Sequence, residues 1–382
     1  MKPEQFTQSN SGKVIKTIGG SWAFLPNPLP PKIEYTPALV KALAEAERAI
    51  GELRGISDEI PDPTILLRPF IRMEAVLSSR IEGTRATLED IFNNEGAQLA
   101  LFESGRDIKE VQNYIEALEY GLDRLTSLPI SLRFIREIHA KLMQEVKGKD
   151  FRPGEFRTTQ NFIGSAGMTL EDASYVPPPP EKMPKLLGQL ESFLNQTSDI
   201  PELLKIGYIH YQFEAIHPFG DGNGRVGRLL IALLLNAWGI LPRPVLNLSA
   251  YFEAQRDDYY NHLLMVSQRG EWLEWLTYFL AGVKQESKKS IQRIRGLAGL
   301  RGMYRELIKK ERADERISQA TDVFFSSPIL SIRQLEKRLE IPYPAAERTM
   351  ERLVELGIAR ELTGKVRNRV YQVDGILDLL NN

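Results

Sequence analysis

The sequence predicts a mainly α-helical globular protein, and three observations support that prediction. Apolar residues recur along most of the chain with the spacing of amphipathic helices. Alternating strand patterns are few before residue 355. The composition, 42% hydrophobic and 26% charged, is that of an ordinary globular protein. A chain of 382 residues has room for two or three domains, each with its own core.

Charge and cysteine content exclude several classes of function. The 49 basic and 50 acidic residues give a net charge of -1, so no general basic field attracts nucleic acid, and any DNA contact must be local. Cysteine is absent, which excludes disulfides, thiolate catalysis and cysteine-bound zinc. The chain starts without a signal-peptide pattern, and its longest apolar run, 229–238, is too short to span a membrane. We therefore expect a cytoplasmic protein with no membrane partner.

The N-terminal third is expected to begin as an arm and continue as helices. The first thirty residues are rich in Ser, Gly and Pro and predict an extended arm. Thr36 suits a helix N-cap and Pro37 a first helical position, which predicts a helix that runs to Gly55. Pro69 is expected to start a second helix, which Gly83 ends as a C′ residue.

The middle of the chain shows a series of helical patterns. They cover roughly 107–126, 131–146, 183–195, 201–216 and 225–238, with Asp107 and Ser131 as candidate caps. The exception is 156–177, where apolar pairs flank a glycine-containing turn. That segment predicts a short exposed hairpin, which a polyproline stretch at 177–180 closes.

The C-terminal part has the order of a winged helix. After a highly charged stretch at 286–318, which predicts a helical connector, two helices are expected at 331–339 and 345–356. Two alternating segments around Thr363 and Gly364 predict a β-hairpin. The expected divisions are an N-terminal helical region (1–105), a central domain (106–285), the connector (286–318) and a winged helix-turn-helix domain (319–382).

One segment, from His217 to Arg228, brings together residues suited to phosphate chemistry. Glycines at 220, 222 and 224 precede a strongly apolar helix, so backbone N–H groups can converge on an anion at a helix N-terminus. Arg225 and Arg228 add positive charge for phosphate oxygens. Asp221 offers an oxygen ligand for Mg²⁺, and His217 can accept a proton near neutral pH.

Each part alone is a weak signal. The glycine spacing does not fit a dinucleotide-binding fingerprint, and a lone histidine such as His217 is more often structural than catalytic. His139 and His210 lie in helical patterns, lack metal-ligand spacing to an acidic partner, and are expected to be structural or peripheral. The combination is what indicates function.

That combination resembles the motif of the Fic family of protein adenylyltransferases, His-x-Phe-x-Asp/Glu-Gly-Asn-Gly-Arg-x-x-Arg. Each fixed position is filled here, by His217, Phe219, Asp221, Gly222, Asn223, Gly224, Arg225 and Arg228. The resemblance implies a Fic-type helical bundle with a short hairpin flap, and transfer of AMP from ATP to a Ser, Thr or Tyr hydroxyl of a target protein. The Gly-Asn-Gly loop favours this reaction over phosphorylation, for which divergent members typically carry Lys there.

The resemblance also implies a role for each position. His217 would be the general base and Phe219 a core anchor. Asp221 would bind Mg²⁺, while Asn223 and the amides of 222 and 224 surround the phosphates. Arg225 and Arg228 would contact the β- and γ-phosphates.

The likeness extends over about 36–285. Phe162, Ile163 and Gly164 resemble the family's flap, which binds the target by strand addition. Tyr251 and Tyr260 fall in a segment that resembles the helix beside the nucleotide base, and are expected to line that pocket.

A second motif suggests a built-in brake. Ser78 and Glu82 are four residues apart and share one helix face, and Glu82 falls in the last turn, where the helix dipole disfavours a carboxylate. The pattern is similar to the Fic inhibitory motif, Ser/Thr-x-x-x-Glu-Gly/Asn. This resemblance implies that Glu82 pairs with Arg228 and holds ATP in a pose unsuited to attack.

Other functions remain open at the level of sequence. The first alternative is a transcription regulator that senses a nucleotide at the same site without transferring it. The second is a hydrolase that removes AMP from a modified protein, with Glu82 orienting the water. The C-terminal part, 319–382, has nine basic and nine acidic residues, with Lys365, Arg367 and Arg369 on the expected wing and Arg348 and Arg352 on the second helix. It permits contact with DNA or with a protein partner, or homodimer formation.

Overall fold

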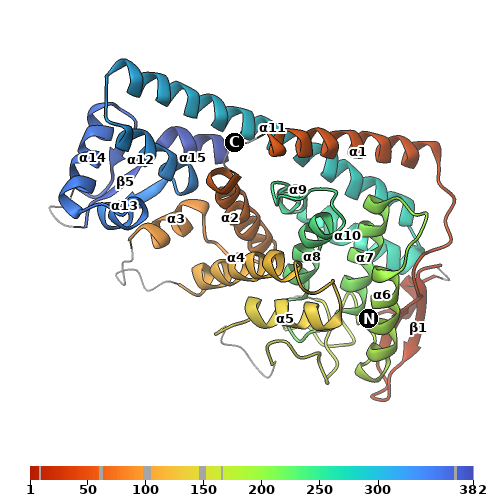
Figure 1. Cartoon of the computed structure of the whole chain (residues 1–382). Helices are drawn as coiled ribbons and strands as arrows, with labels where there is room; N and C mark the ends of the chain where they lie inside the picture. Colours follow the sequence, from red (N-terminus) through yellow and green to blue (C-terminus); the bar gives the residue numbers. More distant parts are fainter. Residues whose placement is uncertain are drawn as a thin grey trace. The chain divides into compact units, whose positions relative to one another are not determined.

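The computed structural model describes residues 1–7, 10–59, 63–97, 105–145, 152–164, 167–364 and 368–381 (Figure 1). The chain divides into two compact units. The first holds Met1–Gly51, Asn113–Pro242 and Leu248–Glu286, and the second holds Glu52–Gln112, Arg243–Asn247 and Ser287–Asn382. Helices dominate both, as the sequence predicts.

The first thirty residues form a hairpin, so the prediction of an extended arm was wrong. After a 3₁₀ turn at Pro3–Gln5, strands β1 (Gly12–Lys16) and β2 (Trp22–Pro26) pair antiparallel. The loop between them contains two consecutive glycines, and Gly20 has a φ of +83°. The Phe24 N–H donates to the Val176 carbonyl at 2.8 Å, which attaches the hairpin to the chain beyond the predicted flap. That long-range pairing carries no local sequence signal.

The predicted helices of the first unit are present with small shifts of their ends. Thr36 caps helix α1 (Pro37–Asp58), since its hydroxyl accepts from the Leu39 amide at 3.2 Å, and Ser131 caps α5 (Leu132–Leu142) in the same way. Asp107 is not a cap: it lies inside α4 (Arg106–Arg124). A 3₁₀ turn at Pro180–Lys182 leads into α6 (Met183–Asn195).

Helices α7 (Glu202–Ile216) and α8 (Asn223–Ala237) form the centre of this unit (Figure 1). Nearly every residue of α7 is buried, because its apolar side chains occupy all faces and neighbours surround it: α6, α8, α10 and β2. Helix α8 packs against α7 and α5. The loop that carries the motif therefore joins the two most enclosed helices of the unit.

Three further helices complete the central part of the chain. They are α9 (Leu248–Ala254), α10 (Arg256–Arg269) and the long α11 (Trp272–Lys310). The break at Gln255 separates two helices where the resemblance implied one. Trp275 of α11 donates its indole N–H to the Gly207 carbonyl of α7 at 3.0 Å.

The second unit contains the helix with the predicted brake. Helix α2 (Pro63–Ile81) begins six residues before the predicted start, and Pro69 lies inside it. It packs against α12 (Glu315–Ser326), and α3 (Leu88–Ala97), which the sequence did not predict, lies beside strand β3. The buried Arg72 of α2 binds both carboxylate oxygens of Glu95 in α3 at 2.8–2.9 Å. That pair holds the two helices together.

The C-terminal part of the second unit alternates helices and short strands. Strand β3 (Ile329–Ser331) precedes α13 (Ile332–Leu339), α14 (Tyr343–Glu355), β4 (Arg360–Glu361), β5 (Val370–Gln372) and α15 (Asp374–Asn381). The sheet has the order β3-β5-β4, antiparallel throughout. Ser331 and Gln334 form a reciprocal capping box at the start of α13. Lys365 and Arg367 of the predicted basic wing lie outside the described residues.

None of the helices in the described part of the chain combines the length and apolar character needed to cross a membrane.

Candidate functional site

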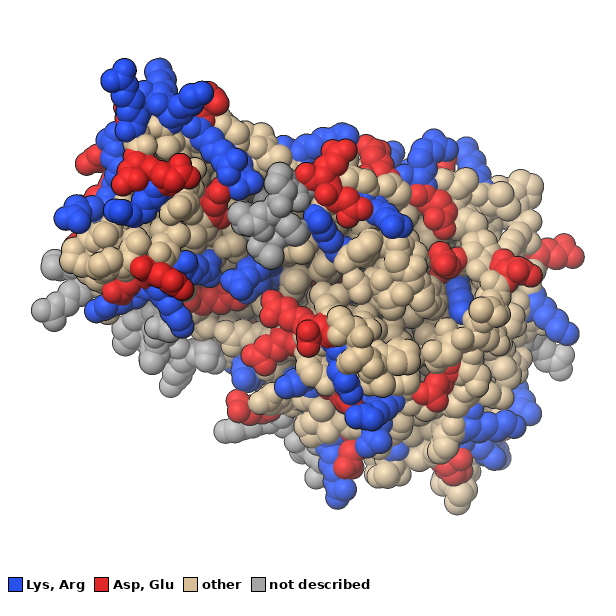
Figure 2. Space-filling model, viewed as in Figure 1, with Lys and Arg blue, Asp and Glu red and all other residues tan. Residues whose placement is uncertain are grey.

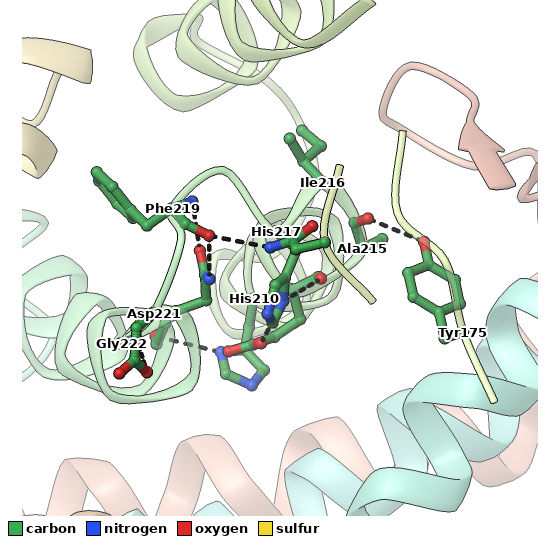
Figure 3. Close-up of polar contacts among 12 residues, drawn as sticks. Tyr175, His210, Ala215, Ile216, His217, Phe219, Asp221 and Gly222 are labelled. Carbon is green, nitrogen blue, oxygen red and sulfur yellow. Dashed lines mark hydrogen bonds and ion pairs between the residues drawn. The ribbon is translucent and has the colours of Figure 1, made fainter. Parts of the chain in front are cut away.

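His217 is the residue at which α7 ends. Its backbone has φ +52° and ψ +60°, the left-handed region that a non-glycine residue seldom adopts, while its amide still donates to the Phe213 carbonyl at 2.9 Å. This conformation turns the chain sharply into the loop that leads to α8 (Figure 3). A backbone held in an unfavoured region is a frequent feature of functional sites.

The hydrogen bonds of the His217 ring define its tautomer. Nδ1 lies 3.3 Å from the carbonyl oxygen of Glu214, and a carbonyl only accepts. In the neutral ring Nδ1 therefore carries the proton, and Nε2 is the unprotonated nitrogen. A histidine in this tautomer can accept a proton at Nε2.

The loop between His217 and α8 is held by Asn223 and Phe219. The Asn223 carboxamide accepts from the Phe219 amide and donates to the Phe219 carbonyl, both at 2.8 Å, so it closes the loop on itself. The Phe219 ring is fully buried, as its implied role as an anchor requires. Gly222 occupies the N-cap of α8 with φ +77°, and a Cβ there would lie 2.8 Å from the Met143 sulfur. A glycine is needed at that position.

His139 is packed against this loop, although the sequence did not connect the two. Its ring stacks on Phe219 with centroids 3.7 Å apart, Nδ1 accepts from the Gly154 amide at 2.8 Å, and Nε2 donates to the Asp221 carbonyl at 3.1 Å. Burial lowers the pKa of His139 to about 4, so the ring is neutral near pH 7. The expectation of a structural histidine fits this geometry, but a peripheral position does not.

His210 is likewise buried beside the motif. Nδ1 donates to the Gly227 carbonyl at 3.2 Å, and Nε2 accepts from the Tyr259 hydroxyl at 2.8 Å. Burial lowers its pKa to about 3. It is a neutral link between α7, α8 and α10.

Arg157 forms hydrogen bonds to backbone carbonyls at the C-terminal end of α7. Its Nε donates to the His217 carbonyl at 2.9 Å, and its other nitrogens donate to the carbonyls of Thr159, Pro178 and Ile216. The guanidinium is buried, and desolvation lowers its pKa to about 10. Tyr175 adds a hydroxyl bond to the Ala215 carbonyl at 2.8 Å (Figure 3).

The predicted phosphate and metal ligands differ in exposure. Arg225 and Arg228 are 4% and 2% exposed, and the Arg225 guanidinium lies 3.7 Å from the Met143 sulfur. The Asp221 side chain is 50% exposed, with one oxygen 2.6 Å from the Gly222 amide and 3.9 Å from Arg225. Among the described residues, no cluster of three or more His, Asp or Glu side chains forms a metal cage. A single exposed carboxylate suits Mg²⁺, which takes most of its ligands from water and phosphate.

The predicted flap is described in part. Ile163 forms an isolated antiparallel bridge to Tyr175, with the Ile163 amide donating to the Tyr175 carbonyl at 2.8 Å. Ile163 is 39% exposed, Gly164 is exposed, and Phe162 is half-buried against the core beneath the N-terminal hairpin. Exposed residues are therefore present at the place the sequence indicated, with the backbone of Ile163 itself paired to Tyr175.

A cavity of about 710 Å³ lies between the N-terminal hairpin and the flap. Its apolar wall includes Ile18, Trp22, Leu170 and Pro179, and its charged lining residues are Glu171 and Glu181. It does not include the residues of the motif. It is therefore a surface beside the flap, distinct from the motif loop.

Tyr251 and Tyr260 occupy different environments. Tyr251 in α9 is buried, with its ring centroid 5.0 Å from that of Tyr278. Tyr260 in α10 is 38% exposed, and the Arg256 guanidinium lies 5.7 Å from its ring. Their contact with the adenine base stays a prediction.

The brake motif is placed at the end of α2 in the second unit. Ser78 is fully buried, and Glu82 is exposed just after the last helical residue, Ile81. The Glu82 amide donates to the Ser79 carbonyl at 3.1 Å, and Gly83 has φ +99°. The carboxylate therefore projects from a turn that stops the helix.

Three residues near the motif were missed by sequence reasoning: His139, Arg157 and Glu214. Their partners lie as far as 82 residues away, as for His139 and Asp221. No residue type or spacing near these three positions marked them as neighbours of the motif.

Comparisons with known proteins agree with this geometry. Residues 40–123 match the Fic/DOC family N-terminal domain, and residues 129–235 match the Fic/DOC family, so that together the matches span half of the chain. A protein adenylyltransferase Fic of Drosophila grimshawi is 30% identical over 198 residues, which are 50% of this chain and 37% of the relative. The matched region thus covers well under half of that relative.

Two solved structures share the fold. A Fic family protein from Desulfovibrio desulfuricans G20 superposes with a TM-score of 0.59 at 22% identity, covering 90% of this chain and 98% of that one. Fic-1 from C. elegans superposes with a TM-score of 0.55 at 25% identity, covering 69% and 75%. With the motif loop between α7 and α8 and both domain matches in place, the chain belongs to the Fic family.

Proposed function

We propose that this protein transfers the adenylyl group of ATP to a hydroxyl side chain of a target protein. The observation that carries the proposal is the motif loop, in which His217 has Nε2 as its unprotonated ring nitrogen and precedes the N-terminus of α8 by six residues of chain. The matched curated relatives are named protein adenylyltransferases, which supports the same reaction. ATP is therefore the proposed substrate.

The chemistry follows from the tautomer of His217. Nε2 takes the proton of the target hydroxyl, and the hydroxyl oxygen forms a bond to the α-phosphorus of ATP. The bond from the α-phosphorus to the oxygen bridging to the β-phosphate breaks, and pyrophosphate leaves with that electron pair. The target keeps AMP in phosphodiester linkage.

Phosphate binding is proposed for the start of α8. Gly222 at the N-cap has no side chain to occupy the N-terminal amides, so an anion can bind there, and Gly224 follows within the first turn. Arg225 and Arg228 supply positive charge from the same helix. Asp221 is the proposed Mg²⁺ ligand, and the ion, when bound, neutralises phosphate charge.

The alternatives raised by the sequence, a nucleotide sensor and an AMP-removing hydrolase, gain no support from the matched relatives, which are named for transfer. A pure sensor also has no need of a base at His217.

The proposal is tested by His217→Ala. Loss of a general base is expected to lower transfer by at least about a hundredfold while ATP binding remains. Transfer would be followed with ATP labelled in the α-phosphate, and binding by calorimetry. Retained transfer in a folded His217→Ala protein would contradict the assignment.

The flap is proposed to bind the target by strand addition along residues 162–164. Support comes from the exposure of Ile163 and Gly164 and from the cavity beside the flap. The apolar wall of the cavity and its two lining glutamates, Glu171 and Glu181, suit a target segment that has an apolar side chain next to a basic one.

Autoinhibition by Glu82 is also proposed. Its support is the sequence pattern Ser78 to Gly83 and the position of Glu82 in the exposed turn that ends α2. The predicted pairing of Glu82 with Arg228 stays part of this proposal.

The C-terminal part is proposed to be a winged-helix module that contacts a protein partner rather than DNA. The order of its helices and strands supports the winged-helix assignment. Several of its described basic residues are paired within the module: Arg369 with Glu347 and Glu351, and Arg352 with Glu355. Acidic and basic side chains lie interspersed over the face of this part that is shown in Figure 2.

Salt-dependent DNA retention in a filter-binding assay at physiological ionic strength would contradict a protein-only role for the C-terminal part. Homodimer formation and a cytoplasmic location remain predictions.

A further inference from the structure

A second carboxylate lies beside His217, on its own helix. Glu214 is in the last turn of α7, and its Oε2 lies 3.9 Å from His217 Nδ1, while its backbone carbonyl lies 3.3 Å from the same nitrogen. The Glu214 side chain is only 11% exposed. One residue thus presents both its carbonyl and its carboxylate to the Nδ1 side of the ring.

The neighbouring helix leaves room for this carboxylate. A Cβ on Gly227 of α8 would lie 2.2 Å from Glu214 Oε1, so no residue larger than glycine fits at 227 without moving Glu214. The carboxylate is enclosed between α7 and α8, the two central helices of the first unit.

This placement is unfavourable for stability in two respects. Burial penalises a carboxylate, and the C-terminal end of a helix carries partial negative charge. Residues placed against both preferences are commonly retained for function. A cation that forms at His217 during the reaction would offset both penalties.

Other charged and titratable groups of the first unit surround the pair. Arg157 approaches the backbone carbonyl of His217 rather than the ring. Burial raises the pKa of Tyr259 in α10. The charges of Glu214 and Arg228 also lie close enough to this hydroxyl to shift its pKa, Glu214 upward and Arg228 downward. Asp221, in the loop, is half exposed. Among these groups, Glu214 is the acidic one that the structure places at Nδ1.

We propose that Glu214 is a positioning residue for His217. Its carbonyl fixes the proton on Nδ1, and its carboxylate stabilises the imidazolium that forms when Nε2 takes the proton of the attacking hydroxyl. The Nδ1 proton stays on the ring throughout, and Glu214 does not become protonated. The inference rests on the proposed transfer reaction and names a component that the family motif does not contain.

The test uses the full chain with Glu82→Gly in all proteins, so that the predicted brake is absent. Glu214→Gln removes the charge and keeps the shape. It is expected to lower the transfer rate at pH 7.5 by about tenfold or more, and to shift the pH midpoint of the rate down by about one unit or more, with ATP affinity unchanged. The matched control is Glu202→Gln, an exposed glutamate in the first turn of α7, which should change neither quantity.

A second variant disturbs the same contact without removing either charge. Gly227→Ala should displace the carboxylate and shift the pH midpoint in the same direction as Glu214→Gln. An unchanged pH midpoint in a folded Glu214→Gln protein would overturn the proposal, whatever Gly227→Ala does.

The contact can also be read without turnover. NMR titration of the His217 ring, assigned by comparison with His217→Ala, should give a lower pKa in Glu214→Gln than in the parent. If the parent transfers no AMP, the proposed function fails, and the titration still decides whether Glu214 acts on His217. Equal titration curves would remove the electrostatic role.

Discussion

The Nε of Arg157 donates a hydrogen bond to the backbone carbonyl of His217 at 2.9 Å. The contact links the base of the flap to the residue at which α7 ends in a left-handed conformation. Carbonyl groups at the end of a helix lack partners within the helix, and Arg157 supplies one for Ile216 as well. The position of the proposed base therefore depends on a side chain sixty residues earlier in the chain.

We predict that Arg157→Met lowers transfer by about a hundredfold, because a small displacement of His217 misaligns its Nε2. The loss of several buried hydrogen bonds should also lower the free energy of unfolding by about 2–4 kcal/mol. Arg157→Lys should retain part of the transfer rate and part of the lost free energy of unfolding. Initial rates and thermal unfolding measure the two effects, and wild-type rates in Arg157→Met would show that the contact does not position His217.

Glu82→Gly is predicted to raise the initial rate of transfer or self-labelling by at least about tenfold, which corresponds to an inhibitory contact of about 1.4 kcal/mol. Arg85→Gly, an exposed residue three positions later, is the control for a change in the same turn. A rate in Glu82→Gly no higher than that of wild type would exclude the brake.

Stability should depend on pH through His139. Burial lowers its folded pKa to about 4, whereas the unfolded value is about 6.5. The unfolded chain therefore binds this proton first as the pH falls, so the stabilising contribution is complete above pH 6.5 and is lost down to about pH 4. The expected loss is about 3 kcal/mol. Urea denaturation at several pH values measures it, and a His139→Gln variant with an equally steep decline would assign the effect elsewhere.

The cavity beside the flap is predicted to select targets. Ile18, in the turn of the N-terminal hairpin, is 93% exposed and lines it. Ile18→Asp should reduce labelling of proteins in a lysate several-fold relative to self-labelling, with ATP affinity unchanged. If the two labelling signals fall together, the cavity has no separate role in target recognition.

Local patterns predicted the helices well and the long-range contacts poorly. Helix α6 has the predicted ends, and the caps at Thr36 and Ser131 are confirmed, because capping depends on residues three positions apart. The ends of α7 and α8 lie within two residues of the positions expected on either side of the motif loop.

Two errors have a physical cause in tertiary structure. The hairpin β1–β2 is fixed by the bond from Phe24 to Val176, which no short window of sequence reveals. Helix α2 starts before Pro69 because it packs along α12, and that packing outweighs the loss of one backbone donor at the proline. His139 and Arg157 were missed because their contacts with the motif join segments 60 or more residues apart. Glu214 is only three residues before His217, and its significance depends on its burial, which the local sequence does not show.

The central claim, transfer of AMP by the motif loop, is tested most directly by the position of the label. Glu82→Gly protein is incubated with a lysate and with ATP labelled in either the α- or the γ-phosphate. We predict that protein bands carry the α label and not the γ label, and that His217→Ala removes them. Bands that carry the γ label instead would show phosphorylation and contradict the claim.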